Sequence, residues 1–311
     1  MANTWGGMTY TNIVQTAIRA FSSKLIALKA FTLDLEPTRA TQGEVIGTRV
    51  VPAASAASDL HDTHSGSRAA AAGDITTTAV TVTLNQNPIE GFHLTDEEAA
   101  KIGDGVWEDT KDGLIETTAH SVAESMLNYV FNLITNANFS TIVHTGAASA
   151  FDLDDVVDIR TTLKKAGWPM QRTKLVLDAD YVGALQKDNA IQDRSASGIP
   201  VAETGELPRV NGLPLLEAET LPPSGGTPES ENLTGFVCTP SCMAIAARVI
   251  EPQAPDKLEW FEVIVEPETG LPIVYRAWYD PDEGKILHTF ELWYGASVAY
   301  STALQRIRSS S

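Results

Sequence analysis

The feature that most constrains the fold is a stretch of 22 residues, 53–74, in which Leu60 is the only large apolar side chain. The other residues are mostly alanine, serine, glycine, histidine, aspartate and threonine. Ordering a residue costs roughly 1–2 kcal/mol, and so few apolar groups bury too little surface to offset that cost. A segment of this length without large apolar residues indicates either a functional loop or a disordered segment.

Composition places the chain among ordinary globular proteins and narrows the functions open to it. Hydrophobic residues make up 43% of the 311 residues and charged residues 20%, which excludes global disorder. The formal charge of −18 argues against a general basic surface for nucleic-acid phosphates. No apolar run reaches the ~20 residues of a membrane span, and the first residues do not form a secretory signal. We therefore expect a soluble, cytosolic protein of about two domains.

Hydrophobic periodicity predicts both helices and strands in the first two thirds of the chain. An amphipathic helix is expected over 10–30, and a helix ~45 Å long is expected over Val106–Asn136. A third helix begins at Asp152–Asp155, because acidic residues stabilise the positive end of a helix. Strands are expected over Ile75–Leu84 and Leu175–Asp178.

The last third of the chain has the pattern of an antiparallel meander. Strands are expected over Trp260–Val265, Ile273–Tyr279 and Lys285–Tyr294. The connections 266–270 and 280–284 contain the proline, aspartate and glycine residues that favour turns. Together with the helices, these strands predict a mixed α+β fold.

Residue types suited to catalysis or metal binding occur, but none forms a convincing site. The run His61–His64 holds two histidines and an aspartate, without further ligands nearby in the sequence. The turn 280–284 is similar to a calcium loop, but Lys285 stands where such a loop needs glycine. Cys238 and Cys242 lack partner ligands and are expected to be small buried residues. We predict no catalytic, cofactor-binding or metal-binding residue.

An acidic stripe on the long helix is the strongest candidate for a contact site. Glu108, Asp112 and Glu116 are four residues apart and therefore share one helix face. The acids can simply stabilise the positive end of the helix, which explains Glu108 better than Glu116. They can also bind a cation from another subunit, for which Arg68 is the best candidate as the only Lys or Arg between Arg49 and Lys101. A catalytic pair of carboxylates is the third alternative.

The order of these parts resembles the major capsid proteins of tailed phages with the Hong Kong 97-like fold. The resemblance covers nearly the whole chain and is carried by Phe21–Leu35, Val80–Thr95, Leu175–Leu185, Arg209–Pro222 and Ala277–Ile307. It implies an N-terminal arm (1–52), an extended loop (53–94), a peripheral domain with the long spine helix (95–140), an axial domain (141–257), the peripheral meander (258–294), and a C-terminal segment that can rejoin the axial domain (295–311).

The resemblance implies a non-enzymatic subunit that assembles with itself into hexamers and pentamers of an icosahedral phage head. The head would enclose double-stranded DNA without sequence-specific binding, would be assembled in the host cytoplasm, and would contact no membrane. The expected helix begins near Thr11, so we expect any scaffolding protein to be a separate chain. A portal and a decoration protein are further partners that the resemblance allows, and no cofactor is implied. The alternatives are a shell protein of a bacterial protein-cargo nanocompartment, a hydrolytic enzyme, or a phage tail or connector protein.

Overall fold

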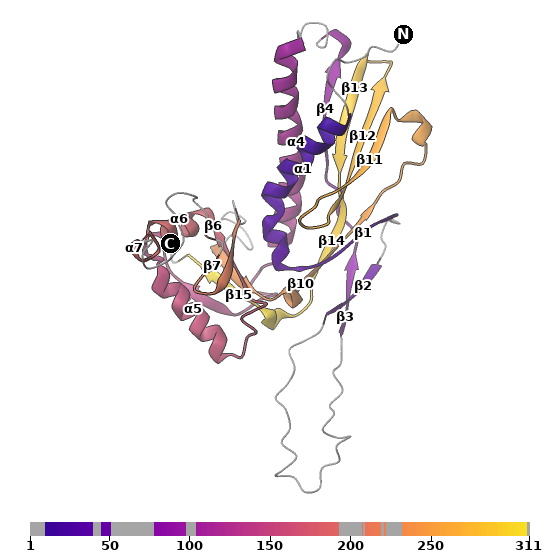
Figure 1. Cartoon of the computed structure of the whole chain (residues 1–311). Helices are drawn as coiled ribbons and strands as arrows, with labels where there is room; N and C mark the ends of the chain where they lie inside the picture. Colours follow the sequence, from indigo (N-terminus) through magenta and orange to yellow (C-terminus); the bar gives the residue numbers. More distant parts are fainter. Residues whose placement is uncertain are drawn as a thin grey trace, which may run out of the picture.

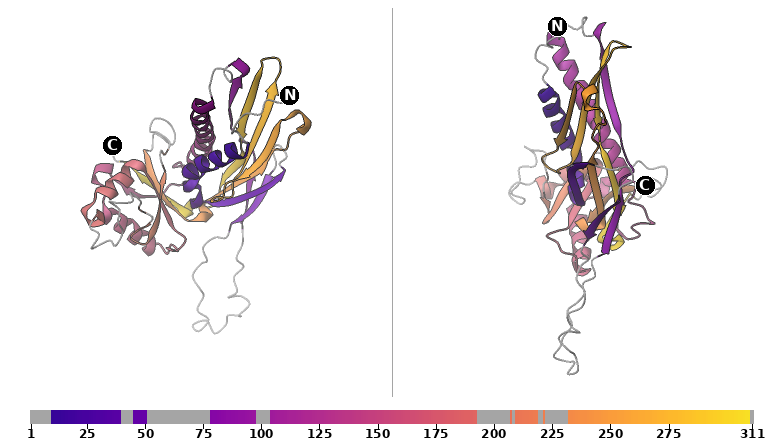
Figure 2. Two further views of the ribbon diagram at one scale, coloured as in Figure 1. Left: turned by 45° about the horizontal axis from the view of Figure 1, so that its top comes forward. Right: turned by 90° about the vertical axis from the view of Figure 1, so that its right-hand side faces the viewer.

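The computed structural model describes residues 10–39, 45–50, 78–97, 104–192, 207, 209–218, 221 and 232–309. These residues form two bodies that lie side by side (Figure 1). We call them the helix–sheet body, which holds helices α1 and α4, and the second lobe, which holds helices α5, α6 and α7. Seen edge-on, the elements form a thin slab (Figure 2).

The helix–sheet body consists of two long helices that pack on one face of a four-stranded antiparallel sheet. The helices are α1 (Tyr10–Lys24) and α4 (Asp104–Phe131). The strand order is β11 (Trp260–Val265), β12 (Pro272–Asp280), β13 (Lys285–Glu291) and β4 (Ile89–Thr95). Phe21 of α1 meets Phe290 of β13 edge-on, with ring centroids 6.2 Å apart. The apolar faces of helices and sheet therefore form one core.

In Figure 1 a three-stranded sheet lies below this core, and a two-stranded ribbon packs against it. Its order is β1 (Thr32–Arg39), β10 (Met243–Val249) and β14 (Trp293–Val298), with β1 parallel to β10. The ribbon pairs β2 (Val45–Val50) with β3 (Thr78–Thr83). Val80 and Val82 of β3 pack on Ala244 and Ala246 of β10, which closes a small second core.

The second lobe is built on a six-stranded sheet with helices on one face. The strand order is β5 (Ile142–Thr145), β15 (Leu304–Arg308), β9 (Leu233–Cys238), β6 (Lys174–Asp178), β8 (Leu213–Ala218) and β7 (Arg209–Val210). Leu175 and Leu177 of β6 face α5 (Leu153–Lys165), α6 (Ala179–Lys187) and α7 (Asn189–Gln192). Val176 points the other way and joins the core of the helix–sheet body.

The predicted α+β class is confirmed, and two element predictions need correction. The expected strand Lys285–Tyr294 is two strands, because the chain passes from β13 in one sheet to β14 in another at Leu292. The long helix ends at Phe131 instead of Asn136, since Asn138 turns back and its side-chain amide donates to the carbonyl of Leu133 at 2.8 Å.

The first helix is also shorter than expected. The predicted helix 10–30 continues beyond α1 as a 3-10 turn, η1 (Leu25–Ala30). The described part of the strand expected over Ile75–Leu84 is β3, and 75–77 lie outside the described residues. Among the helices that the structure describes, none is long and apolar enough to cross a bilayer.

Candidate assembly site

The turn η1 fills the space between the two bodies. Leu25 and Leu28 are at most 1% exposed, and Phe31 directly after η1 is 4% exposed. The ring of Phe31 stacks on Phe236 of the six-stranded sheet at 5.8 Å, and Phe131 at the end of α4 meets the same ring at 5.9 Å. A short N-terminal segment thus packs against the end of the long helix and against the second lobe.

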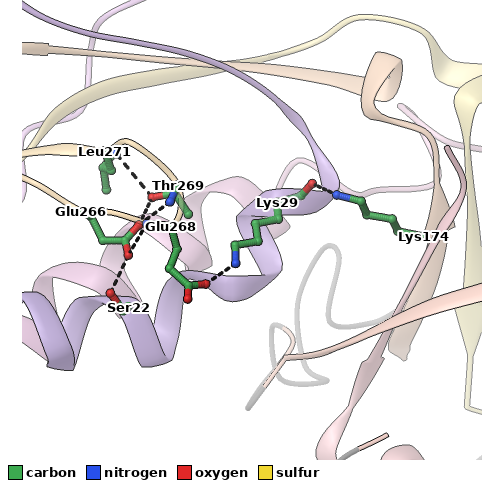
Figure 3. Close-up of polar contacts among 7 residues, drawn as sticks. All are labelled: Ser22, Lys29, Lys174, Glu266, Glu268, Thr269 and Leu271. Carbon is green, nitrogen blue, oxygen red and sulfur yellow. Dashed lines mark hydrogen bonds and ion pairs between the residues drawn. The ribbon is translucent and has the colours of Figure 1, made fainter. Parts of the chain in front are cut away.

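A buried carboxylate fixes α1 to the turn between β11 and β12 (Figure 3). The hydroxyl of Ser22 donates to Glu266 Oε1 at 2.5 Å, and the N–H of Glu268 donates to the same oxygen at 3.0 Å. The N–H of Thr269 donates to Oε2 at 2.5 Å, and its hydroxyl donates to the same oxygen. Burial favours the neutral acid, but these hydrogen bonds outweigh it and lower the pKa of Glu266.

Lys29 makes contacts in two directions from the same turn (Figure 3). Its ammonium group forms an ion pair with Glu268 in the β11–β12 turn. Its carbonyl oxygen accepts a hydrogen bond from the ammonium group of Lys174 at the start of β6. Burial, acting with the nearby charge of Lys29, lowers the pKa of Lys174. We call the five residues Ser22, Lys29, Lys174, Glu266 and Glu268 the Lys29 joint.

The predicted acidic stripe lies on α4, and the structure describes one of its side chains. Glu116 is exposed, whereas its helix neighbours Ile115 and Ala119 are buried. Glu108 and Asp112 fall within α4, but their side chains lie outside the described part. Arg68, the expected partner, also lies outside the described residues. The pairing of Arg68 with the stripe therefore stays a prediction.

The other clusters suggested by the sequence are a histidine run, a cysteine pair and a turn. His61–His64 lies outside the described residues. Cys238 and Cys242 are free and buried, as expected. The turn 280–284 joins β12 to β13, and Gly284 has a φ of +58°, which a glycine adopts without strain. Within the described ranges, no three His, Cys, Asp or Glu side chains are grouped as a metal site.

Exposed apolar side chains gather on the four-stranded sheet. Ile89 of β4 is 51% exposed and Val265 of β11 is 47% exposed. Trp260 and Tyr279 of the same sheet are also exposed. Scattered apolar residues are ordinary on a protein surface, but several on one sheet suit an interface.

Sequence reasoning missed the Lys29 joint. Ser22 and Glu266 are 244 residues apart in the chain, so no local spacing connects them. The sequence feature that pointed to part of it was the pair Glu266 and Thr269 in the expected turn. Their side chains can accept hydrogen bonds from the backbone N–H groups of that turn. That signal predicts a turn, but it does not identify the helix that donates to it.

No protein-family model matches the sequence, and no curated protein matches it. Solved structures match the fold. The capsid structure of the cyanophage P-SCSP1u has a TM-score of 0.55 at 10% identity, covering 90% of this chain and 86% of that chain. The capsid of a native GTA particle has a TM-score of 0.52 at 15% identity, covering 95% and 91%. A virus-like particle from Pyrococcus furiosus has a TM-score of 0.51 at 10% identity, covering 97% and 100%. This chain has the Hong Kong 97-like capsid fold.

Proposed function

We propose that this protein is the major capsid protein of a tailed phage and acts by self-association. The observation that carries the proposal is a likeness of fold to capsid and particle subunits that spans 90% or more of this chain. The function is structural, and no enzymatic activity is assigned.

The same proposal includes the form of the assembly and its contents. The subunits form hexamers and pentamers that close into an icosahedral head around double-stranded DNA. The net charge of −18 suits this role, because a wall that only encloses DNA has no need of strong attraction to it. The protein is then located in the virion after assembly in the host cytoplasm, with scaffolding, portal and decoration proteins as candidate partners.

We assign parts of the chain to roles in the shell. Residues 1–52 serve as the N-terminal arm and 53–94 as a loop that reaches over a neighbouring subunit. Residues 95–140 and 258–294 form most of the helix–sheet body and serve as the peripheral domain, while α1 and most of β4 in that body come from the ranges of the arm and the loop. Residues 141–257 supply the axial domain, although β10 within this range pairs with β1 and β14. The pairing of β15 with β5 and β9 supports an axial role for 295–311.

Electron microscopy of the purified protein tests the proposal. We expect closed particles of uniform size, or rings of five and six subunits, at moderate protein concentration. A protein that is monomeric at every concentration and salt condition, and folded, would contradict the function.

The second candidate is a shell of a bacterial protein-cargo nanocompartment. The likeness to the virus-like particle from Pyrococcus furiosus favours it, because that likeness covers 97% of this chain. The contents of particles isolated from the natural source separate the two functions. Nuclease-protected genomic DNA supports the phage head, and an enclosed protein without DNA supports the nanocompartment.

A further inference from the structure

We propose that the Lys29 joint sets the angle between the helix–sheet body and the second lobe, and through it the curvature of the shell. This inference rests on the proposed function, because curvature matters only if the chain forms a closed shell. Lys29 is the central positioning residue. Its side chain binds the β11–β12 turn through Glu268, and its carbonyl binds the second lobe through Lys174.

The covalent connections between the two bodies do not fix the angle between them. Noncovalent contacts therefore determine this angle. The chain crosses between them after α4, between β9 and β10, and between β14 and β15 (Figure 1). The last two crossings are short, each with a single 3-10 turn, η4 (Pro240–Cys242) and η6 (Ser301–Ala303). Short connections of this kind limit the separation of two bodies but leave their relative rotation to the surfaces in contact.

The two bodies contact each other through apolar packing and through polar bonds. Only the polar bonds depend strongly on the angle between the bodies. Leu25, Leu28 and Phe31 give apolar packing, which is non-directional and tolerates a small rotation. Hydrogen bonds and ion pairs depend on angle and distance, so a rotation weakens them. The bond from Ser22 to Glu266 and the ion pair from Lys29 to Glu268 hold η1 on the helix–sheet body. The bond from Lys174 to the Lys29 carbonyl then orients the second lobe against the same turn.

A closed shell requires subunits that meet at defined angles. Interfaces between identical subunits close into rings only when the rotation from one subunit to the next is correct. A subunit whose two bodies rotate freely presents its surfaces at a range of angles. Loss of the Lys29 joint should therefore leave association intact but reduce the uniformity of the particles.

The first test measures the angle in unassembled subunits of the full chain. Spin labels on Glu124→Cys in α4 and Asp158→Cys in α5 report the distance between the two bodies, because both positions are exposed and the native cysteines are buried. We expect a narrow distance distribution in the parent protein and a broadened one in Lys174→Met, which removes the donor to the Lys29 carbonyl. Lys187→Met removes a cation from an exposed position on α6 and is the matched control, with an unchanged distribution.

The second test measures particle diameters by electron microscopy. The Lys29→Met and Glu268→Gln variants should give more than one diameter or open sheets, and the charge exchange Lys29→Glu with Glu268→Lys should restore uniformity. Distance distributions as narrow in Lys174→Met as in the control would overturn the inference, whether or not particles form. A parent protein with a narrow distribution and no particles would instead contradict the proposed function alone.

Discussion

The hydroxyl of Ser22 lies 2.5 Å from Glu266 Oε1 and donates to it, which joins the first helix to a turn 244 residues later. Glu266 is fully buried, and its carboxylate also accepts bonds from the backbone of its own turn. A buried charge is tolerated when hydrogen bonds replace the water that it loses. The charged form of Glu266 therefore holds the helix and the turn together.

Removal of the Ser22 hydroxyl should destabilise the protein. The Ser22→Ala variant leaves Glu266 with one donor fewer in a buried place, which costs about 1–3 kcal/mol. Urea denaturation of the unassembled protein measures this change in the free energy of unfolding. The Ser140→Ala variant alters an exposed serine and should change it by less than about 0.5 kcal/mol. Equal effects of the two substitutions would show that the bond contributes nothing.

His288 should make stability depend on pH between 6.5 and about 4. Burial lowers the pKa of His288 from 6.5 to about 4, and its Nδ1 lies 2.7 Å from the hydroxyl of Tyr275. The folded protein disfavours the charged ring. The contribution of the neutral ring to the free energy of unfolding is therefore present above pH 6.5 and is lost as the pH falls toward 4. The loss approaches about 3 kcal/mol at low pH.

The His288→Phe variant isolates this contribution because it removes the titrating group and keeps an aromatic ring against Phe92. We expect the difference in unfolding free energy between the parent protein and the variant to change over that pH range. Burial also raises the pKa of Glu291, and this shift favours the folded protein as the pH falls. The effect of Glu291 is the same in the parent protein and in the variant, so it cancels in the difference. The exposed His93 is the control, and His93→Gln should leave the pH profile unchanged. An identical slope for His288→Phe and the parent would contradict the prediction.

Gly295 should not tolerate a side chain. A Cβ at this position would overlap the carbonyl oxygen of Thr83, so Gly295→Ala forces β3 away from β14. We expect a loss of at least about 1–3 kcal/mol, as in other overpacked cores. Gly113 is the matched control, because a Cβ there meets nothing within 4 Å and the position is exposed on α4. Gly113→Ala should raise the melting temperature slightly through helix propensity, and a similar gain at Gly295 would show that the strands separate without cost.

The acidic stripe should respond to charge reversal if it binds Arg68 of a neighbouring subunit. The Arg68→Glu variant should assemble less, since like charges then meet at the proposed contact. Adding Asp112→Arg should partly restore the assembled fraction in sedimentation. Adding Asp158→Arg on α5 instead controls for a general change in net charge. Rescue by both additions, or by neither, would count against the proposed pair.

Local chemistry in the sequence determined several elements by itself. Asp152 accepts bonds from the backbone N–H groups of Asp154 and Asp155, and this capping box begins α5 where the acids predict a helix. β11 runs over Trp260–Val265, the same residues that the sequence predicts as a strand. The turn after β12 closes because Asp280 accepts from the N–H of Asp282 at 3.0 Å. In the cap and in the turn the hydrogen-bonding partners are within a few residues of each other, so a short stretch of sequence contains the whole interaction.

Only the tertiary structure decided how these elements combine. The division of the expected strand at Leu292 depends on two different sheets, to which distant strands β4 and β10 contribute. The need for glycine at 295 depends on the backbone of Thr83. The role of Lys29 depends on Glu268 and Lys174, which come from opposite sides of the turn that carries it. Local hydrogen bonds and periodicity are determined by neighbouring residues, whereas burial, close approach and ion pairing are determined by segments that meet only after the chain has folded.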